Sequence, residues 1–108
     1  MSELLKVVKN PFLYNGYDIP KILLVSPVFV GENIKNSFMY GTFTMNSLEV
    51  SHKLPEIYEG LAKTFGCEFM RASDFASPSD VDSIHMDEEN HAKLAAAIAD
   101  KIREIFRP

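Results

Sequence analysis

Apolar and polar residues follow two different patterns along this chain, and each pattern predicts one type of element. Residues 21–29, KILLVSPVF, are almost continuously apolar, as in a strand buried on both faces of a parallel sheet. Pro27 has no N–H to donate to a neighbouring strand, so we expect this strand to end near Ser26. Residues 67–71, CEFMR, predict a second short strand.

Helical periodicity predicts an amphipathic helix within residues 47–66. Its apolar side chains recur at i, i+3 and i+4 and would line one face: Leu54, Ile57, Tyr58, Leu61, Ala62 and Phe65. Ser51 is the expected N-cap, with Pro55 in or near the first turn, and Gly66 is expected just past the last turn.

A second and clearer helix is predicted over residues 87–106. Asp87 is expected to cap it, and the acidic residues that follow suit the positive end of a helix. Its apolar face consists of Leu94, Ala95, Ile98, Ile102 and Ile105. Residues 4–9 fit the end of a further helix, and the turn dipeptides Asn-Pro and Asn-Gly in residues 10–20 predict a connector.

The order of these elements predicts an α/β fold in a single domain over residues 1–108, in which residues 1–20 supply a helix end and a connector. Strand, helix, strand, helix is the succession of a parallel strand pair joined by a helical crossover. Two strands make a thin sheet, because sheets usually contain about four to six strands. The strand at 21–26 is typical of a central strand, yet the chain offers it one neighbour. We therefore expect a missing segment or another chain beside it.

Composition and charge narrow the function classes. Of the 108 residues, 46% are apolar and 24% are charged, as in an ordinary soluble domain. The net charge of −4, without a Lys/Arg cluster, disfavours nucleic-acid binding. The single cysteine, Cys67, excludes an intrachain disulfide and a multi-Cys zinc site. No apolar run has the length of a signal peptide or a membrane span, so a cytoplasmic protein without membrane contact is expected.

Asp82 and His85 have the spacing that acid–base chemistry requires. An Asp three residues before a His, on a turn that precedes a helix, can fold back and orient Nδ1 of the imidazole. Nε2 is then free to take a proton from a serine hydroxyl. The turn also follows the second strand, near the carboxyl ends where open α/β sheets place ligands. The alternative is that Asp82 is an ordinary turn residue and His85 an exposed side chain without a role.

Other candidate residues have weaker support. His85, Asp87 and His91 could ligate a metal ion, but residues six apart share a helix face poorly and Asp87 is expected as a cap. No metal or cofactor is therefore predicted. The serines beyond the N-terminus lack the flanking glycines of a nucleophile elbow, so each is expected to be a cap, turn or strand residue. Cys67 is expected in the core, and His52 on an exposed helix face.

The stretch VDSIHMDEENHAKLAAAIADKI, residues 81–102, resembles the last block of the SGNH (GDSL-type) esterases and lipases. That block reads Asp-x-x-His, then an acidic residue and a His at the start of an Ala/Leu-rich helix. Upstream, PKILLVSP and LPEIYEGLAKTFGCEFMRASD are similar to a strand, helix and strand of the same family. The resemblance covers about residues 21–106 in order.

This resemblance implies a flavodoxin-like fold, here a partial three-layer α/β/α sandwich with a short parallel sheet. It implies acyl transfer through a serine, with Asp82 as the triad acid and His85 as the general base. The family's nucleophile and oxyanion donors lie in Gly-Asp-Ser and Gly-x-Asn-Asp segments ahead of the first matched strand, and this sequence contains neither segment. The chain thus resembles the C-terminal half of a serine ester hydrolase and is expected to be inactive alone.

The resemblance also implies a small-molecule ester substrate, provided that an N-terminal half completes the fold. Residues 30–46 are expected to form a long surface loop. Its apolar side chains and their neighbours either wall an acyl or alcohol pocket or, as we prefer, pack at a contact with a partner chain or a second copy: Phe29, Phe38, Met39, Tyr40, Phe43 and Met45. The alternative function is a non-catalytic truncated module that self-associates through the exposed edge of strand 21–26.

Overall fold

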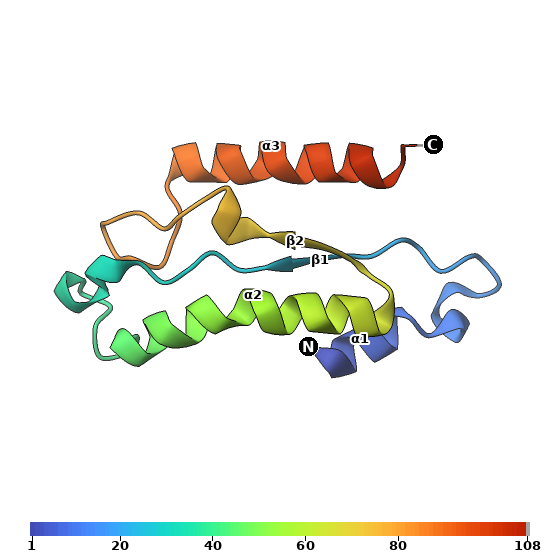
Figure 1. The fold of residues 1–108 in the computed structure, drawn as a ribbon, viewed down its shortest axis with the longest axis horizontal. Coiled ribbons are helices and arrows are strands. Elements are labelled where there is room, and N and C mark those ends of the chain that lie inside the picture. Colours follow the sequence, from blue (N-terminus) through green and yellow to red (C-terminus); the bar gives the residue numbers. More distant parts are fainter. Residues whose placement is uncertain (108) are drawn as a thin grey trace.

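The fold has three layers in a computed structural model that describes residues 1–107. The strands β1 (Leu23–Ser26) and β2 (Glu68–Arg71) form the middle layer (Figure 1). The helices α1 (Ser2–Val8) and α2 (Met45–Phe65) lie on one side of the strands, and α3 (Glu88–Ile105) lies on the other. The predicted α/β class and the partial three-layer sandwich with a short parallel sheet are therefore confirmed.

The two strands pair in parallel, with Leu23 opposite Glu68 and Ser26 opposite Arg71. β1 ends at Ser26, directly before Pro27, as the missing N–H of proline predicts. Leu24 and Ser26 are its buried positions. Within residues 1–107 β1 pairs with β2 alone, so its other edge is unpaired in the part of the chain that the structure describes.

The start of α2 differs from the sequence-based expectation. The helix begins at Met45 after Thr44, whose N–H donates to Oγ of Ser47 at 3.0 Å. Ser51 is not an N-cap, because it lies inside the helix and is buried, and its Oγ accepts the N–H of Val30 at 2.9 Å. A serine before an apolar periodic run is typical of a cap, but here the hydroxyl ties the helix to the segment after β1 instead. The helix end is as predicted, with Gly66 in the left-handed conformation.

The segment over residues 30–46 is more ordered than the expected surface loop. It contains a 3-10 helix, η2 (Glu32–Asn36), whose Ile34 is fully buried. Two shorter 3-10 helices, η1 (Pro11–Tyr14) and η3 (Ala72–Asp74), follow α1 and β2. The buried Ile34 packs this segment against the rest of the chain. A 3-10 helix of five residues is too short to leave a periodic pattern in the sequence, so it could not be predicted.

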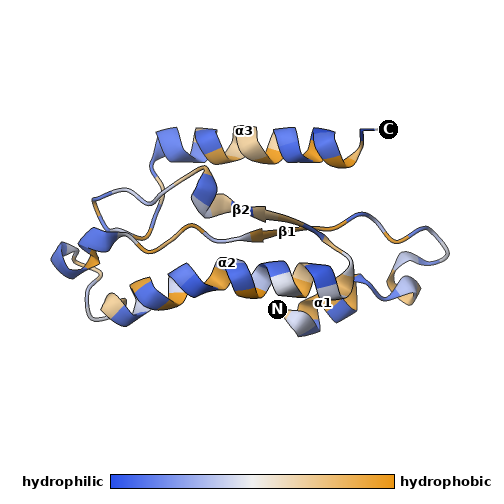
Figure 2. Ribbon diagram, viewed as in Figure 1, coloured by the Kyte–Doolittle hydropathy of each residue, from blue (hydrophilic) through white to orange (hydrophobic). Residues whose placement is uncertain are grey.

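The hydrophobic core is small. Leu5, Leu24 and Ala62 form its buried cluster, so one residue each from α1, β1 and α2 meets there. Apolar residues make up most of β1, whereas β2 begins and ends with a charged residue, and the helices carry both polar and apolar residues along their length (Figure 2). None of the 18 residues of α3, all of them described, is buried. The layer that α3 forms is therefore loosely packed against the strands.

The described chain is more extended than a compact domain of the same length. The radius of gyration is 16.2 Å, whereas a compact domain of this length has about 13 Å. The accessible surface is 7367 Å², whereas a compact monomer of 12.2 kDa exposes about 6,100 Å². Many large apolar side chains are exposed, among them Phe12, Tyr17, Phe38 and Val81. Among residues 1–107 no helix combines the length and apolar character that crossing a membrane requires.

Candidate active site

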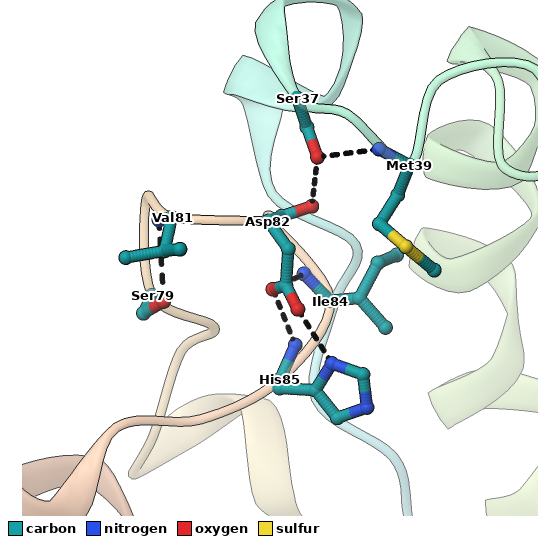
Figure 3. A network of polar contacts seen from close by, with 7 residues as sticks. All are labelled: Ser37, Met39, Ser79, Val81, Asp82, Ile84 and His85. Carbon is teal, nitrogen blue, oxygen red and sulfur yellow. Dashed lines mark hydrogen bonds and ion pairs between the residues drawn. The ribbon is translucent and has the colours of Figure 1, made fainter.

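The turn between η3 and α3 brings Asp82 and His85 together (Figure 3). Nδ1 of His85 lies 2.5 Å from Oδ2 of Asp82. The Asp82 side chain is 11% exposed, whereas the His85 side chain is 75% exposed. The ring edge with Nε2 points away from the carboxylate (Figure 3). The structure thus has a buried acid that holds the inner nitrogen of an exposed imidazole.

Both carboxylate oxygens of Asp82 accept hydrogen bonds from its own turn. Oδ1 accepts the backbone N–H groups of Ile84 and His85, each at 2.8 Å, while Oδ2 faces the imidazole. The side-chain bond to His85 and these two backbone donors lower the pKa of Asp82 from 3.8 to about 2. Each donor stabilises the charged carboxylate more than the neutral acid. Asp82 is therefore ionised at neutral pH and can stabilise a positive charge on His85.

Hydrogen bonds within the turn explain why it folds in this way. The N–H of Ser79 donates to the carbonyl of His85 at 2.8 Å, and the N–H of Ser83 donates to the carbonyl of Ser79 at 2.9 Å. Ser83 adopts a left-handed backbone with φ of 64°, which reverses the chain between Asp82 and His85. That conformation is strained for a residue other than glycine or asparagine. The strain is offset by the bonds that close the turn over residues 79–85.

Two hydrogen bonds join this turn to the segment after β1. Oγ of Ser37 donates to the carbonyl of Asp82 at 2.7 Å, and the N–H of Gly31 donates to the carbonyl of Ser83 at 2.8 Å (the Ser37 contact is drawn in Figure 3). Neither residue could be predicted to lie at the site, since contacts across 45 or more positions leave no signal in a single sequence. The only sequence signal at Gly31 is the presence of a glycine in an irregular segment, which does not indicate a contact with Ser83.

A hollow of about 550 Å³ lies beside the turn. Phe29, Gly31, His52 and Asp80 are among the residues that line it. The rings of Phe29 and His52 stack with centroids 3.8 Å apart. His52 is exposed as predicted, but it also forms one wall of this hollow.

The other candidate residues do not gather into a second site. Within residues 1–107 no group of three or more His, Cys, Asp or Glu is placed to hold a metal ion, so His85, Asp87 and His91 form no such group. Asp87 caps α3 instead, accepting the N–H of Asn90 at 2.9 Å. Cys67 is half-buried and packs against the core cluster.

Neither Ser83 nor Ser26 is placed to act as the nucleophile in this arrangement. Ser83 is next to Asp82 in sequence, but it is 1% exposed and cannot meet a substrate. Ser26, at the carboxyl end of β1, is fully buried. The geometry therefore supplies an oriented imidazole that can accept and return a proton.

Comparison with solved structures shows that esterases share this fold. The carbohydrate acetylesterase Est24 from Sinorhizobium meliloti superposes with a TM-score of 0.72 at 31% identity, over 83% of this chain and 41% of that one. The aryl esterase of M. smegmatis gives a TM-score of 0.68 at 28% identity, over 82% and 40% of the two chains. A carbohydrate acetylesterase family member from S. meliloti, 24% identical, shares the fold with a TM-score of 0.80 over 94% and 47%. The fold is thus the α/β fold of the SGNH-type esterases.

The chain spans about half or less of the length of the solved structures that it matches. No protein-family model matches the sequence, and no match is found among curated proteins. The matched structures cover between 82% and 99% of this chain but less than half of each neighbour.

Proposed function

We propose that this chain is the C-terminal segment of an SGNH (GDSL-type) serine ester hydrolase, in which His85 is the general base and Asp82 its orienting acid. The observation that supports this most directly is the contact of 2.5 Å between Nδ1 of His85 and Oδ2 of Asp82. A base without a fixed tautomer would accept a serine proton poorly. Here the buried carboxylate holds a proton on Nδ1 and leaves Nε2 as the acceptor.

In the proposed reaction, Nε2 of His85 takes the hydroxyl proton of a serine as the serine oxygen bonds to the ester carbonyl carbon. Asp82, ionised because its pKa is about 2, stabilises the imidazolium that forms. The imidazolium then gives its proton to the departing alkoxide, and an acyl-enzyme remains. In the second half, water attacks the acyl carbon and loses a proton to Nε2. The imidazolium then gives this proton to the departing serine oxygen, which releases the acid and restores the free serine and the neutral imidazole.

The serine and the oxyanion donors are proposed to lie outside these 108 residues, in another part of the same protein or in a partner chain. The sequence contains no Gly-Asp-Ser or Gly-x-Asn-Asp segment. The unpaired edge of β1 and the accessible surface of 7367 Å², against about 6,100 Å² for a compact monomer, offer room for that part. The excess exceeds the roughly 800 Å² that one partner buries in a standard interface.

The proposed substrates are small esters of short acids, because the named neighbours are carbohydrate acetylesterases and an aryl esterase. An aryl acetate is therefore the first substrate to test. Neither a cofactor nor a metal takes part in the proposed chemistry, in which every proton passes through His85.

The test is a chimera in which this chain replaces the matched 41% of Est24. We expect the folded chimera to hydrolyse p-nitrophenyl acetate and to react with a fluorophosphonate serine probe. His85→Ala should reduce kcat by about 10³-fold or more. The matched control is His91→Ala, since His91 is a second exposed histidine six residues along the chain, and it should retain activity. A folded chimera whose turnover ignores His85→Ala would refute the proposal.

The 108-residue chain alone provides a second arm. It is expected to show no fluorophosphonate labelling and no ester turnover, since Ser83 beside Asp82 is buried and the sequence has no Gly-Asp-Ser segment. Labelling that disappears in His85→Ala would mean that an internal serine is recruited, and the placement of the nucleophile outside the chain would be wrong.

A second candidate is a non-catalytic module that self-associates through β1. Its support is the unpaired edge of that strand, which exposes backbone donors and acceptors to another chain. Light scattering on the chain alone distinguishes the candidates. A stable homo-oligomer together with an inactive chimera would favour the module, whereas a monomer that gains activity in the chimera would favour the hydrolase.

A further inference from the structure

The hydroxyl of Ser37 occupies an unusual place for a residue of the segment after β1. Its Oγ donates to the backbone carbonyl of Asp82 at 2.7 Å and accepts the N–H of Met39 at 3.0 Å (Figure 3). This one hydroxyl therefore donates a hydrogen bond to the candidate site and accepts one from its own segment. Met39 fixes the direction of that lone pair, which leaves the proton directed at Asp82.

The carboxylate of Asp82 cannot by itself fix the position of His85 in the molecule. All three of its partners, the N–H groups of Ile84 and His85 and the ring nitrogen of His85, belong to the same turn. These bonds set the imidazole relative to Asp82, but the whole turn could still move as a unit. Its location depends on contacts from outside residues 79–85.

Ser37 provides a side-chain contact of that kind, and Gly31 a backbone contact. The bond from Ser37 ends on the carbonyl of Asp82 itself, and the bond from Gly31 ends on the carbonyl of the next residue, Ser83. Two adjacent carbonyls are thus held by donors six residues apart on the segment after β1. Side-chain substitution can remove the Ser37 contact, while the Gly31 N–H survives any substitution other than proline.

We propose that Ser37 is a positioning residue that places the Asp82–His85 pair against the end of β1, so that Nε2 faces the position of the attacking serine. This inference rests on the proposed function for its catalytic consequence, but the link between Ser37 and the pair is a property of this chain alone. A displacement of about 1 Å at a reacting group can cost about 100-fold in rate. The hydroxyl therefore acts through Asp82 and does not touch the substrate.

The first arm of the test uses the 108-residue chain and NMR. Ser37→Ala should speed hydrogen exchange of the Gly31 amide, which donates to the adjacent carbonyl of Ser83, and should broaden the backbone amide signals of residues 79–85. Ser37→Thr keeps the hydroxyl and should restore both signals. The control is Ser47→Ala, which removes a hydroxyl that accepts the N–H of Thr44 and has no bond to Asp82. It should lower stability without changing either signal.

The second arm measures Ser37→Ala in the Est24 chimera, where kcat should fall by about 10- to 100-fold while KM changes little. Unchanged exchange of the Gly31 amide and unchanged amide signals of residues 79–85 in Ser37→Ala would overturn the positioning role, whatever the activity. Altered NMR signals in a folded chimera without any esterase activity would leave the Ser37 link standing and overturn the proposed function. A loss of kcat that Ser37→Thr does not restore would also count against the hydroxyl.

Discussion

The backbone N–H of Gly31 donates a hydrogen bond of 2.8 Å to the carbonyl of Ser83, and a Cβ on Gly31 would lie 2.9 Å from Cβ of Ser83. Such close approach of two backbones requires a residue without a side chain on one of them. The segment after β1 and the Asp82–His85 turn therefore meet main chain to main chain, beside the candidate site.

Gly31→Ala should destabilise the fold by about 1–3 kcal/mol, because the new methyl group would press on Cβ and Cα of Ser83. Urea unfolding measures the change. Gly60→Ala is the matched control, since Gly60 lies in α2 and its new methyl group would meet no atom within 4 Å. It should instead stabilise the chain by about 0.5–1 kcal/mol. Equal effects of the two substitutions would contradict the close packing at Gly31.

Ser83→Gly should stabilise the chain by about 1 kcal/mol. Glycine tolerates the φ of 64°, and the substitution removes a buried hydroxyl that has no hydrogen-bond partner within residues 1–107. Ser83→Ala removes the hydroxyl but keeps the backbone strain, so its gain should be smaller. Ser83→Gly should also relieve Gly31→Ala, and the double variant should be more stable than the sum of the single effects predicts. Strict additivity would argue against contact between the two positions.

Acid should weaken the fold partly through Asp82. The hydrogen bond with His85 lowers the folded-state pKa of Asp82 from 3.8 to about 2. A depressed pKa adds stability above about pH 4, and this stability disappears as the pH falls to about 2. In Asp82→Asn the free energy of unfolding should therefore decrease less steeply over that window. Denaturation at a series of pH values measures the slope.

Asp87 should also make the free energy of unfolding decrease as the pH falls, because the backbone N–H of Asn90 lowers its folded-state pKa. The slope should therefore be reduced further in the double variant Asp82→Asn, Asp87→Asn than in either single variant. Identical slopes for the parent chain and the double variant would show that other groups govern the acid response.

Asp87→Ala should destabilise α3 by about 1 kcal/mol, because the carboxylate accepts the N–H of Asn90 at 2.9 Å at the first turn. Asn caps helices nearly as well as Asp, so Asp87→Asn should have a small effect. Hydrogen exchange of the first-turn amides of α3 reports the difference directly. Faster exchange in both variants alike would mean that the charge, rather than the hydrogen bond, stabilises this end.

Local rules predicted the elements and the acid–base pair from the sequence. The apolar run at 21–26 and the periodic apolar residues of α2 and α3 are patterns among neighbouring residues. These patterns were enough to predict β1, both helices and the parallel pairing. The contact between Asp82 and His85 followed from a spacing of three residues on a turn. Their catalytic roles stay a prediction, because geometry alone does not demonstrate proton transfer.

Long-range contacts account for what the sequence could not show. Ser51 has the composition of a helix cap, but the N–H of Val30 approaches its hydroxyl from 21 residues away, and the helix starts earlier. Ser37 likewise reaches Asp82 across 45 residues. A single hydroxyl in an irregular segment has many possible partners, and the folded chain selects one.

The turn over residues 79–85 closes on itself and is held by one further segment, Gly31 to Ser37, of the same half of the fold. In evolutionary terms, substitutions in these two segments constrain one another, while the acid–base geometry makes no demand on the sequence that supplies a nucleophile. If the proposed hydrolase is made of two such parts, gene fusion, fission or exchange of partners redistributes them without rebuilding the Asp–His pair.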